Sequence, residues 1–363
     1  MKECNKRIPI IIPSLDPDER MIYLLKELSI NGFENIIIVN DGSNESYDTI
    51  YKIAREKYKC KIIPHNVNMG KGRALKSAFK YCLDTFPDMV GCVTADSDGQ
   101  HSVECIEQCM RALDKAQDSL ILGVRDFSQD NVPWKSRFGN NLTKLVCTYL
   151  CDIKVSDTQT GLRGIPKSFM QHLLDVKGER FEFETQMLIE AKENLIEIKE
   201  VKITTIYDST NNHVTHFNPI TDSIQIYKIF GKIFMKYVLS SCSSFVVDII
   251  LFVVFEKMLF IFSPESILNV AIATVIARVF SAVYNYVINY KLVFNSKAKI
   301  HTSASKYATL AIVQMTCSAV LTTALSVLFP DVIAKIIIDT LLFFASYLIQ
   351  QRYVFKRDNY GTV

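Results

Sequence analysis

The sequence predicts a chain of two parts: an α/β domain built on a mostly parallel sheet, and an all-α domain of four transmembrane helices. Up to about residue 220, short apolar runs alternate with helical segments of ten to fifteen residues, a pattern typical of βαβ units. From about residue 237 onward, four apolar segments are each near the ~20 residues that a spanning helix needs. The length of 363 residues suits about two domains.

The composition limits the classes of partner and compartment. A formal net charge of +3, with no basic stripe that interleaves with aromatic residues, argues against nucleic acid. The segment over residues 1–9 is short and polar. We therefore expect no signal peptide, and a soluble half that stays in the cytoplasm. None of the ten cysteines forms Cys-x-x-Cys, which favours buried free thiols in a reducing compartment. The helical pairs Cys105/Cys109 and Cys147/Cys151 lack the further ligands of a zinc site.

The soluble half begins with strand and helix units in regular order. Apolar, β-branched runs predict strands over 7–13, 35–40, 61–64 and 89–95. Helices are expected over 18–30, capped by Asp18, over 46–58, and from the glycine-rich segment 68–73 to about 84. In such a sheet the carboxyl ends of the parallel strands meet at one edge, where ligands bind.

Two carboxylates follow the strand over 89–95. Asp96 and Asp98 are two residues apart, and in extended backbone they point the same way. Their repulsion favours a cation between them, and oxygen ligands suit Mg²⁺ or Mn²⁺. Gln100 would add a neutral oxygen and His101 a further contact. The alternative is an ordinary strand-to-helix turn in which Ser102 caps the next helix.

Two other strand ends carry polar groups at the same edge. Asp41 follows the strand over 35–40, a place where a carboxylate commonly hydrogen-bonds a ribose or a base. Segment 68–73, Asn-Met-Gly-Lys-Gly-Arg, puts two glycines and two cations at a helix N-terminus, which suits an anion. It is not a phosphate-binding loop of the Gly-x₄-Gly-Lys type, because residue 65 is His. The alternative is a tight turn.

These motifs together resemble a known enzyme family. Ile-Ile-Ile-Pro-Ser, Val-Asn-Asp-Gly-Ser, Asn-Met-Gly-Lys-Gly-Arg-Ala-Leu-Lys and Asp-Ser-Asp-Gly-Gln-His, in this order, resemble the family-two glycosyltransferases with a GT-A fold, in the branch of dolichyl- and polyprenyl-phosphate sugar synthases. The resemblance runs from about 7 to 227. It implies a nucleotide-sugar donor, a divalent metal and an inverting displacement. It also implies that Asp41 binds the nucleoside, and that Asp96, Asp98 and Gln100 form the metal and diphosphate site.

A second group of motifs suits an anionic acceptor. Arg125 ends a strand over 120–124, and Arg137 lies in a stretch with Trp134 and Lys135 that leads into a helix to about Leu150. The resemblance implies that both arginines hold a lipid phosphate; a solvated charge pair beside a core Trp is the alternative. A phosphate acceptor is already ionised near neutral pH, and it therefore needs positioning and charge neutralisation more than a general base.

Three later residues complete the predicted site. Asp157 lies in a segment that resembles the family's Asp-x-x-x-Gly motif near the reacting sugar, with a turn-capping role as the alternative. Glu182 opens a helix in Phe-Glu-Phe-Glu-Thr, where it could also be a first-turn charge favoured by the helix dipole. His216, like His213, lies in a loop after a strand pair over 196–206. We expect this loop to reach the diphosphate, although loop histidines are more often surface residues.

The predicted site therefore has three sets of residues. Those with catalytic roles are Asp98, Asp157, Arg125 and Arg137. Those expected to bind substrate are Pro13, Asp41, Gly70, Lys71, Asp96, Ser136, Asn140, Arg163, Glu182 and His216. The expected ligands of Mg²⁺ or Mn²⁺ are Asp96, Asp98 and Gln100.

The membrane half begins with a basic segment. Residues 222–236 carry apolar residues at helical spacing with lysines between them, which predicts an amphipathic helix in the headgroup layer. We expect domains over 1–220, 221–236 and 237–363, with spans near 237–258, 267–290, 306–328 and 332–352. Lysines and arginines concentrate in the loop 291–306 and in the tail. The positive-inside rule therefore places both termini in the cytoplasm of a plasma-membrane protein.

The membrane half also repeats itself. Segment 286–294, Tyr-Val-Ile-Asn-Tyr-Lys-Leu-Val-Phe, matches 347–355, Tyr-Leu-Ile-Gln-Gln-Arg-Tyr-Val-Phe, and Lys-Tyr opens both the first and the third span. This predicts two helix hairpins related as a parallel repeat. The spans and motifs resemble the GtrA-like membrane family, which accompanies lipid-linked sugar synthesis. Asp248 and Arg278 are expected to pair within the bundle, as are Lys335 and Asp339.

The sequence thus predicts an inverting glycosyltransferase that moves one sugar from a UDP- or GDP-sugar to polyprenyl phosphate at the cytoplasmic leaflet, for modification of a cell-envelope glycan. One alternative is a processive polysaccharide synthase, but its Gln-x-x-Arg-Trp motif is missing. Another is a lipid-linked sugar flippase whose soluble domain only binds, and a third is a sugar nucleotidyltransferase, whose Gly-rich start is missing. A homo-oligomer through the membrane domain is possible.

Overall fold

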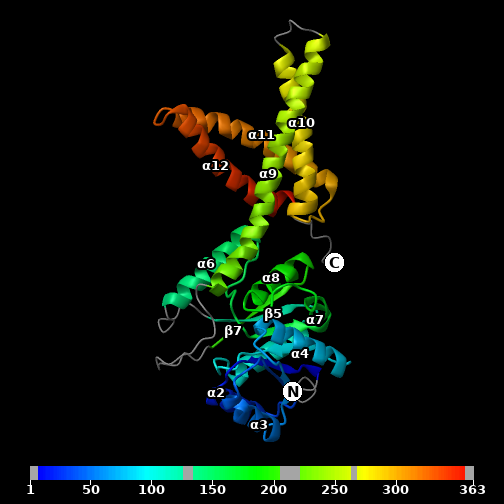
Figure 1. The fold of residues 1–363 in the computed structure, drawn as a ribbon, viewed down its shortest axis with the longest axis vertical. Coiled ribbons are helices and arrows are strands. Elements are labelled where there is room, and N and C mark those ends of the chain that lie inside the picture. The colour runs from blue at the N-terminus through cyan, green and yellow to red at the C-terminus, as the bar shows by residue number, and fades with distance from the viewer. Residues whose placement is uncertain (1–6, 126–133, 205–220, 263–267, 356–363) are drawn as a thin grey trace. The chain divides into compact units, whose positions relative to one another are not determined.

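The protein was studied as a computed structural model that describes residues 7–125, 134–204, 221–262 and 268–355 (Figure 1). Its contacts divide the chain into two compact units. The first contains residues 1–148 and 153–229, and the second contains residues 149–152 and 230–363. We describe each unit by itself.

The first unit is built on a seven-stranded sheet with the strand order β3-β2-β1-β4-β6-β5-β7. The strands are β1 (Ile10–Ser14), β2 (Ile36–Asn40), β3 (Lys61–Pro64), β4 (Gly91–Thr94), β5 (Leu120–Arg125), β6 (Arg163–Pro166) and β7 (Ile198–Ile203). Every neighbouring pair is parallel except the two pairs that β6 makes with β4 and β5. The mostly parallel sheet is therefore confirmed, while the sequence motifs gave no sign of the antiparallel β6.

Helices follow most of the strands along the chain, as expected for βαβ units. They are α2 (Glu19–Ile30), α3 (Asp48–Glu56), α4 (Lys71–Thr85), α5 (Val103–Lys115), α6 (Trp134–Leu150), α7 (Lys167–Leu173) and α8 (Glu182–Glu193), with a short 3₁₀ turn η1 (Glu45–Tyr47) before α3. The Asp18 side chain caps α2, and Ser102 Oγ accepts a hydrogen bond from Cys105 N at the start of α5. Both caps follow the sequence expectation.

The register of the central strands decides where the polar side chains meet. Ile10 and Ile11 of β1 lie beside Val93 and Thr94 of β4, and Ser14 lies beside Asn40 of β2. All five residues of β1 are buried, as befits a strand that is covered on both faces. The three strands run parallel, and the loops after them therefore open at one edge of the sheet.

The second unit contains four helices, among the described residues, that are long and apolar enough to cross a membrane. They are α9 (Thr221–Phe262), α10 (Leu268–Ile288), α11 (Ile300–Leu325) and α12 (Asp331–Ile349), and α10 and α12 continue into the π-helical turns η2 (Asn289–Val293) and η3 (Gln350–Val354). The predicted interfacial helix over 221–236 is not separate, because α9 runs through it without a break. Gly231 does not end the helix; a helical glycine costs only ~1 kcal/mol relative to alanine.

The matched segments 286–294 and 347–355 meet in space. Asn289 Nδ2 donates to Gln350 Oε1 at 2.9 Å, and the Phe294 and Phe355 rings stack with centroids 5.0 Å apart. In both pairs a residue touches its own counterpart in the other repeat. Contacts between counterparts are expected where two repeats face each other across a two-fold axis, and they support the predicted relation of the two hairpins.

The neighbouring aromatic contacts are reciprocal about the same axis. A tyrosine of the first or third span contacts a tyrosine and a phenylalanine of the matched segments in each repeat. The two sets are Tyr237 with Tyr347 (5.0 Å between centroids) and Phe294 (6.2 Å), and Tyr307 with Tyr286 (5.5 Å) and Phe355 (6.3 Å).

Polar side chains also join α9 to α10 at three levels, four residues apart along each helix. The hydrogen bonds are Ser240 Oγ to Asn289 Oδ1 (2.7 Å), Asn285 Nδ2 to Ser244 Oγ (2.7 Å) and Ser281 Oγ to Asp248 Oδ1 (2.8 Å). Both expected ion pairs are confirmed: Asp248 lies 3.3 Å from Arg278, and Lys335 lies 3.0 Å from Asp339.

Candidate functional site

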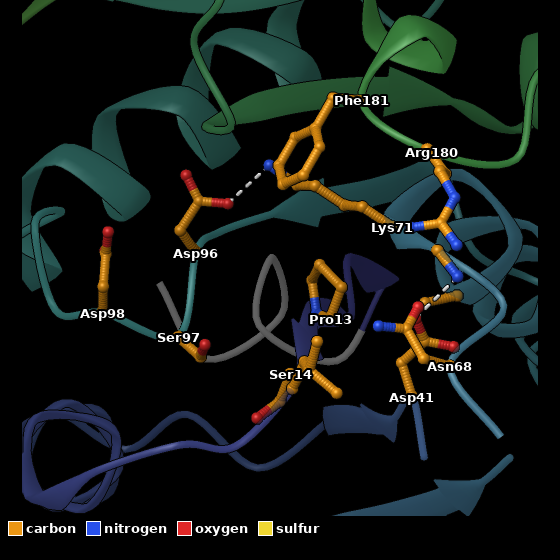
Figure 2. Close-up of a pocket in the computed structure, with 13 residues that line it drawn as sticks. Pro13, Ser14, Asp41, Asn68, Lys71, Asp96, Ser97, Asp98, Arg180 and Phe181 are labelled. Atoms are coloured by element: carbon orange, nitrogen blue, oxygen red, sulfur yellow. Dashed lines mark hydrogen bonds and ion pairs between the residues drawn. The ribbon is translucent and has the colours of Figure 1, made fainter. Parts of the chain in front are cut away.

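A cavity of about 240 Å³ lies at the carboxyl ends of β1, β2 and β4. The cavity therefore has room for a small-molecule group rather than a single ion. Figure 2 shows Asp96 and Asp98 on one side and Asp41 with Asn68 on the other. The lining residues are Pro13, Ser14, Leu15, Asp41, Asn68, Gly70, Lys71, Ala74, Asp96, Ser97, Asp98, Arg180 and Phe181.

Six of the predicted site residues meet in this cavity, although they come from four separate segments: Pro13, Asp41, Gly70, Lys71, Asp96 and Asp98. Parallel pairing of the strands explains the convergence, because each of β1, β2 and β4 delivers its following loop to the same edge. Ser97, Asn68, Arg180 and Phe181 were not predicted. Ser97 and Asn68 lie within recognised motifs, whereas Arg180 and Phe181 reach the cavity from a distant loop.

Asp41 organises the loop beside it. Its Oδ2 accepts a hydrogen bond from Gly70 N (2.8 Å), and its Oδ1 accepts one from Met69 N (3.0 Å) and lies 2.7 Å from His65 Nδ1. His65 Nε2 in turn lies 2.9 Å from Ser77 Oγ. A carboxylate has about four acceptor positions, and Asp41 therefore keeps roughly one for a ligand. His65 was noted in the sequence only as a departure from another motif.

Lys71 extends across the cavity to two carboxylates. Its Nζ lies 2.7 Å from Asp96 Oδ1 and 2.8 Å from Glu184 Oε1, and its side chain is only 15% exposed. Burial disfavours the charged form, but the two carboxylates outweigh it and raise the pKa of Lys71 above its usual value. The expectation that Lys71 binds substrate is therefore incomplete, because its charge is first engaged within the protein.

The two aspartates of the Asp-x-Asp motif differ in charge balance. Burial alone would raise the pKa of Asp96, but Lys71 and His101 hold it well below its usual range. Burial and the charge of Asp96 raise the pKa of Asp98, whose Oδ1 accepts a hydrogen bond from Gln100 N (3.1 Å). Among the residues that the structure describes, none forms an ion pair with Asp98, whereas Lys71 and His101 both contact Asp96.

This imbalance fits a divalent ion. Asp96 and Asp98 supply oxygen ligands of the kind that Mg²⁺ and Mn²⁺ prefer. His101 is buried beside them, with Nε2 3.5 Å from Asp96 Oδ2, and neither ring nitrogen has a hydrogen-bond partner among the residues described. Within the described part of the chain, no three His, Cys, Asp or Glu side chains gather around one point. The fit therefore rests on the aspartate pair, the amide of Gln100 and this histidine.

The glycines and cations of segment 68–73 bind the protein itself. The Arg73 guanidinium pairs with Glu179 (2.7 Å), and Arg73 N donates to Glu179 O (3.0 Å), which occupies an N–H group at the start of α4. A Cβ on Gly70 would lie 2.4 Å from Glu179 O, and one on Gly72 would lie 2.6 Å from Phe183 Cβ. The predicted free anion site at this helix end is therefore largely occupied by the loop over 176–183.

Lys76 fixes the other end of this loop. Its buried Nζ donates to Val176 O (2.6 Å) and Gly178 O (2.9 Å). Glu182 Oε1 accepts hydrogen bonds from Glu179 N (3.0 Å) and Arg180 N (3.3 Å), which shapes the turn that carries Arg180 and Phe181 into the cavity lining. Glu182 therefore acts on the loop backbone in this structure, rather than facing the cavity as expected.

Arg125 and Asp157 form a bidentate ion pair. Arg125 Nε and Nη2 donate to the two carboxylate oxygens at 2.6 and 3.0 Å, and Asp157 also accepts from Gln159 N at 3.0 Å. Asp157 is fully buried, whereas the Arg125 side chain is 18% exposed. The two predicted catalytic residues are thus brought together, with Asp157 as the residue that orients Arg125.

Two predicted substrate-binding residues have structural positions instead. Arg163 is 1% exposed and donates to the backbone carbonyls of residues 158, 160 and 184. Asn140 is equally buried and binds Ser156 O (3.0 Å) and Thr158 N (3.2 Å). In this structure both side chains are engaged in supporting the surrounding loops, and substrate contact by them stays a prediction.

Three further predictions cannot be compared with the structure. His216 lies outside the described residues, and the side chains of Ser136 and Arg137 also lie outside them.

Gly161 explains the Asp-x-x-x-Gly spacing. A Cβ at this position would lie 2.2 Å from Asp96 Oδ2 and 2.5 Å from Oδ1. Thr94 Oγ1 donates to Gly161 O at 2.7 Å and holds the loop in place. The glycine therefore leaves the space that the Asp96 carboxylate occupies.

Comparison with known proteins agrees with both halves of this description. Residues 19–174 match Glycosyl transferase family 2, and residues 236–355 match the GtrA/DPMS transmembrane domain. The chain is 30% identical, over 225 residues, to UDP-N-acetylglucosamine--dolichyl-phosphate N-acetylglucosaminyltransferase of Methanococcus voltae, covering 56% of this chain and 87% of that protein. It is 28% identical, over 241 residues, to an uncharacterized protein of Methanocaldococcus jannaschii, covering 65% of this chain and 95% of that protein.

Among solved structures, glucosyl-3-phosphoglycerate synthase from Mycobacterium tuberculosis, in complex with Mn²⁺, uridine diphosphate and phosphoglyceric acid, is similar with a TM-score of 0.46 and 13% identity. The similarity covers 62% of this chain and 77% of that one.

Proposed function

The chain belongs to glycosyl transferase family 2 and carries a GtrA/DPMS transmembrane domain, and from this we propose that it moves a sugar from a nucleotide-sugar to polyprenyl phosphate. The observation that carries the proposal is the convergence of Asp41, Asp96 and Asp98 on one cavity that also contains Lys71 and Arg180. Carboxylates at a sheet edge together with cations suit a ligand that combines a nucleoside, a diphosphate and a metal.

The donor would lie along the cavity. Asp41, with its remaining acceptor position, would receive a hydrogen bond from the ribose or the base, and Arg180 would approach the diphosphate. The M. voltae relative is named for a UDP-sugar donor, which supports UDP over GDP for this chain. Residues that contact the sugar itself, rather than Asp41 at the nucleoside, would select which sugar is transferred.

Asp96, Asp98 and Gln100 would hold Mg²⁺ or Mn²⁺. When bound, the divalent ion neutralises charge on the departing diphosphate. Gly161 keeps room for the Asp96 carboxylate, and the buried His101 ring closes the other side of it.

The acceptor phosphate would be positioned by Arg125, whose guanidinium Asp157 holds in a fixed plane. Arg137 is the proposed second contact. A phosphate is ionised near neutral pH, and it attacks the anomeric carbon while the bond to the nucleoside diphosphate breaks on the opposite face. One displacement of this kind inverts the anomeric configuration and needs orientation more than a general base.

The four apolar helices would anchor this reaction at a plasma membrane. The loop 291–306 and the chain beyond α12 are rich in lysine and arginine, which supports a cytoplasmic position for both termini and the first unit. Polyprenyl phosphate carries its charge at the bilayer surface, where Arg125 would meet it. The lipid-linked sugar product would then serve modification of a cell-envelope glycan.

The proposal is tested by following a radiolabelled sugar from the nucleotide-sugar to the lipid phosphate. The purified full-length chain is incubated with polyprenyl phosphate, Mn²⁺ and each of a panel of radiolabelled UDP- and GDP-sugars. We expect label from one donor to pass to the organic phase only when lipid phosphate is present, with an inverted anomeric centre in the product. Failure of every donor, or transfer only to growing polysaccharide, would contradict the proposal.

A further inference from the structure

The ammonium group of Lys71 lies where a divalent ion would need to approach Asp96. It is 2.7 Å from Asp96 Oδ1 and 2.8 Å from Glu184 Oε1 (Figure 2 shows the first contact). A carboxylate oxygen that already binds an ammonium has little charge left for a second cation. An ion at this carboxylate would also be repelled by Lys71 at short range.

Two carboxylates bind this ammonium group, and Lys71 neutralises part of their charge. Without it, the carboxylates of Asp96 and Glu184 would repel one another in a largely buried site. Lys71 is well suited to form a temporary ion pair with Asp96, because its charge is carried at the end of a flexible four-carbon side chain. Arg73, two residues further along α4, pairs with Glu179 instead and does not touch Asp96.

A diphosphate in the cavity would offer Lys71 another partner. Lys71 lines the cavity beside Gly70, and its stem can turn from Asp96 toward a bound anion without moving α4. The Asp96 carboxylate would then be free for a divalent ion, which the diphosphate oxygens would also bind. Each ligand would therefore strengthen the binding of the other, as linkage requires.

We propose that Lys71 is a built-in counter-ion that keeps the divalent metal from binding Asp96 until a nucleoside diphosphate enters. Metal and donor then bind tightly only together. The nucleotide part of this inference rests on the proposed function, whereas the competition between Lys71 and the metal does not depend on it.

The experiment measures free Mn²⁺ by electron paramagnetic resonance while Mn²⁺ is titrated into the full-length protein. Without nucleotide, we expect Lys71→Met to bind Mn²⁺ at least ~10-fold more tightly than the unsubstituted chain, within the range of ~5–150-fold that is usual for coupled sites. Arg73→Met removes a neighbouring charge and should leave the affinity within about two-fold. Uridine diphosphate should tighten Mn²⁺ binding by about ten-fold or more in the unsubstituted chain, and far less in Lys71→Met.

Loss of Lys71 leaves buried carboxylates facing each other, and Lys71→Met could unfold. Lys71→Gln is the second variant, because its amide can hydrogen-bond both carboxylates without carrying charge. It should show the same gain in Mn²⁺ affinity, and its melting temperature should rise more with Mn²⁺ than that of the unsubstituted chain.

Equal Mn²⁺ affinity in the Lys71 variants and the unsubstituted chain would overturn the inference. An equal gain in Arg73→Met would do the same, since it would show a general charge effect. If uridine and guanosine diphosphates change Mn²⁺ binding in no variant, the proposed donor class fails, while the nucleotide-free comparison still decides the role of Lys71.

Discussion

In the first unit, polar side chains from distant segments converge on one cavity, whereas in the second unit they pair across neighbouring helices in register. Lys71 binds two carboxylates at once, and Asp98 has no ion-pair partner within the described segments. In the membrane unit Asp248 has Arg278, and Asn289 has its repeat counterpart Gln350. The difference teaches that polar groups without a partner of their own mark the site of chemistry. Polar groups that are paired with each other mark the scaffold.

This comparison predicts two kinds of response to substitution. Changes in the first unit should reduce sugar transfer more than they reduce stability. Its incompletely paired charged groups bind ligands and do not stabilise the fold. Changes at the paired groups of the second unit should act on stability, since Asp248 and Asn289 there each have a protein partner.

Asp98→Asn should give the largest effect. We expect transfer to fall at least ~10³-fold, because the metal loses a charged ligand. The metal-free protein should become more stable at neutral pH: a carboxyl whose pKa is raised by burial and by Asp96 destabilises the fold when ionised, and the destabilisation fades as the pH falls through that pKa. Label transfer and melting temperature without metal measure the two effects. A lower melting temperature would contradict the comparison.

Gly161→Ala should follow, with transfer reduced ~10²-fold. The added methyl would overlap the Asp96 carboxylate and displace it by about 1 Å, a misplacement that can reduce catalysis ~10²-fold. Gly231→Ala is the matched control, since nothing lies within 4 Å of its Cβ. It should retain transfer, and a helical alanine should even stabilise α9 by ~0.5–1 kcal/mol. Equal kinetics for both variants would remove Gly161 from its role.

Asp157→Asn should raise the polyprenyl phosphate requirement about ten-fold with a smaller change in the maximal rate, because Arg125 loses the charged partner that fixes its plane. Lipid titrations at saturating donor measure this split. The control is Glu107→Gln, whose ion pair with Arg111 lies on the surface and should contribute little. A change in donor affinity alone would contradict the assignment.

Asn289→Leu should give the smallest effect, and it should fall on stability. Hydrogen bonds between membrane helices contribute ~0.6 kcal/mol on average, with a maximum of ~1.7 kcal/mol. The cost of Asn289→Leu with Gln350→Leu should be less than the sum of the single costs, because the pair shares one hydrogen bond. Unfolding in mixed micelles measures this cycle, with Thr309→Val as a control whose hydroxyl bonds only its own helix. Strict additivity would contradict a shared bond.

The features that could be predicted from the sequence are those that a short pattern determines. Short apolar, β-branched runs between helical segments predicted the parallel strands, and apolar segments of ~20 residues predicted the four spans. The strand ends predicted that Asp41 would meet Asp96. The repeat predicted the two hairpins, and helical spacing predicted the pair of Lys335 with Asp339. Each of these needs only a few consecutive residues.

The features that could not be predicted depend on contacts between remote segments. Lys76 binds a carbonyl 100 residues away, and this loop brings Arg180 into the cavity. The segment with Gly70 and Lys71 has the composition of an anion site, yet the protein fills most of it. The composition of a segment indicates which groups it can bind. The tertiary structure determines whether those groups belong to a ligand or to the protein itself.

The contact of Phe294 with Phe355 has an evolutionary consequence. A residue that touches its own equivalent lies on an axis, as in a dimer of identical subunits. A two-helix ancestor could therefore have assembled this core as a pair of separate chains, and gene duplication with fusion would have joined them. Once fused, the halves were free to diverge, which is why one now carries Asp248 where the other carries Ser318.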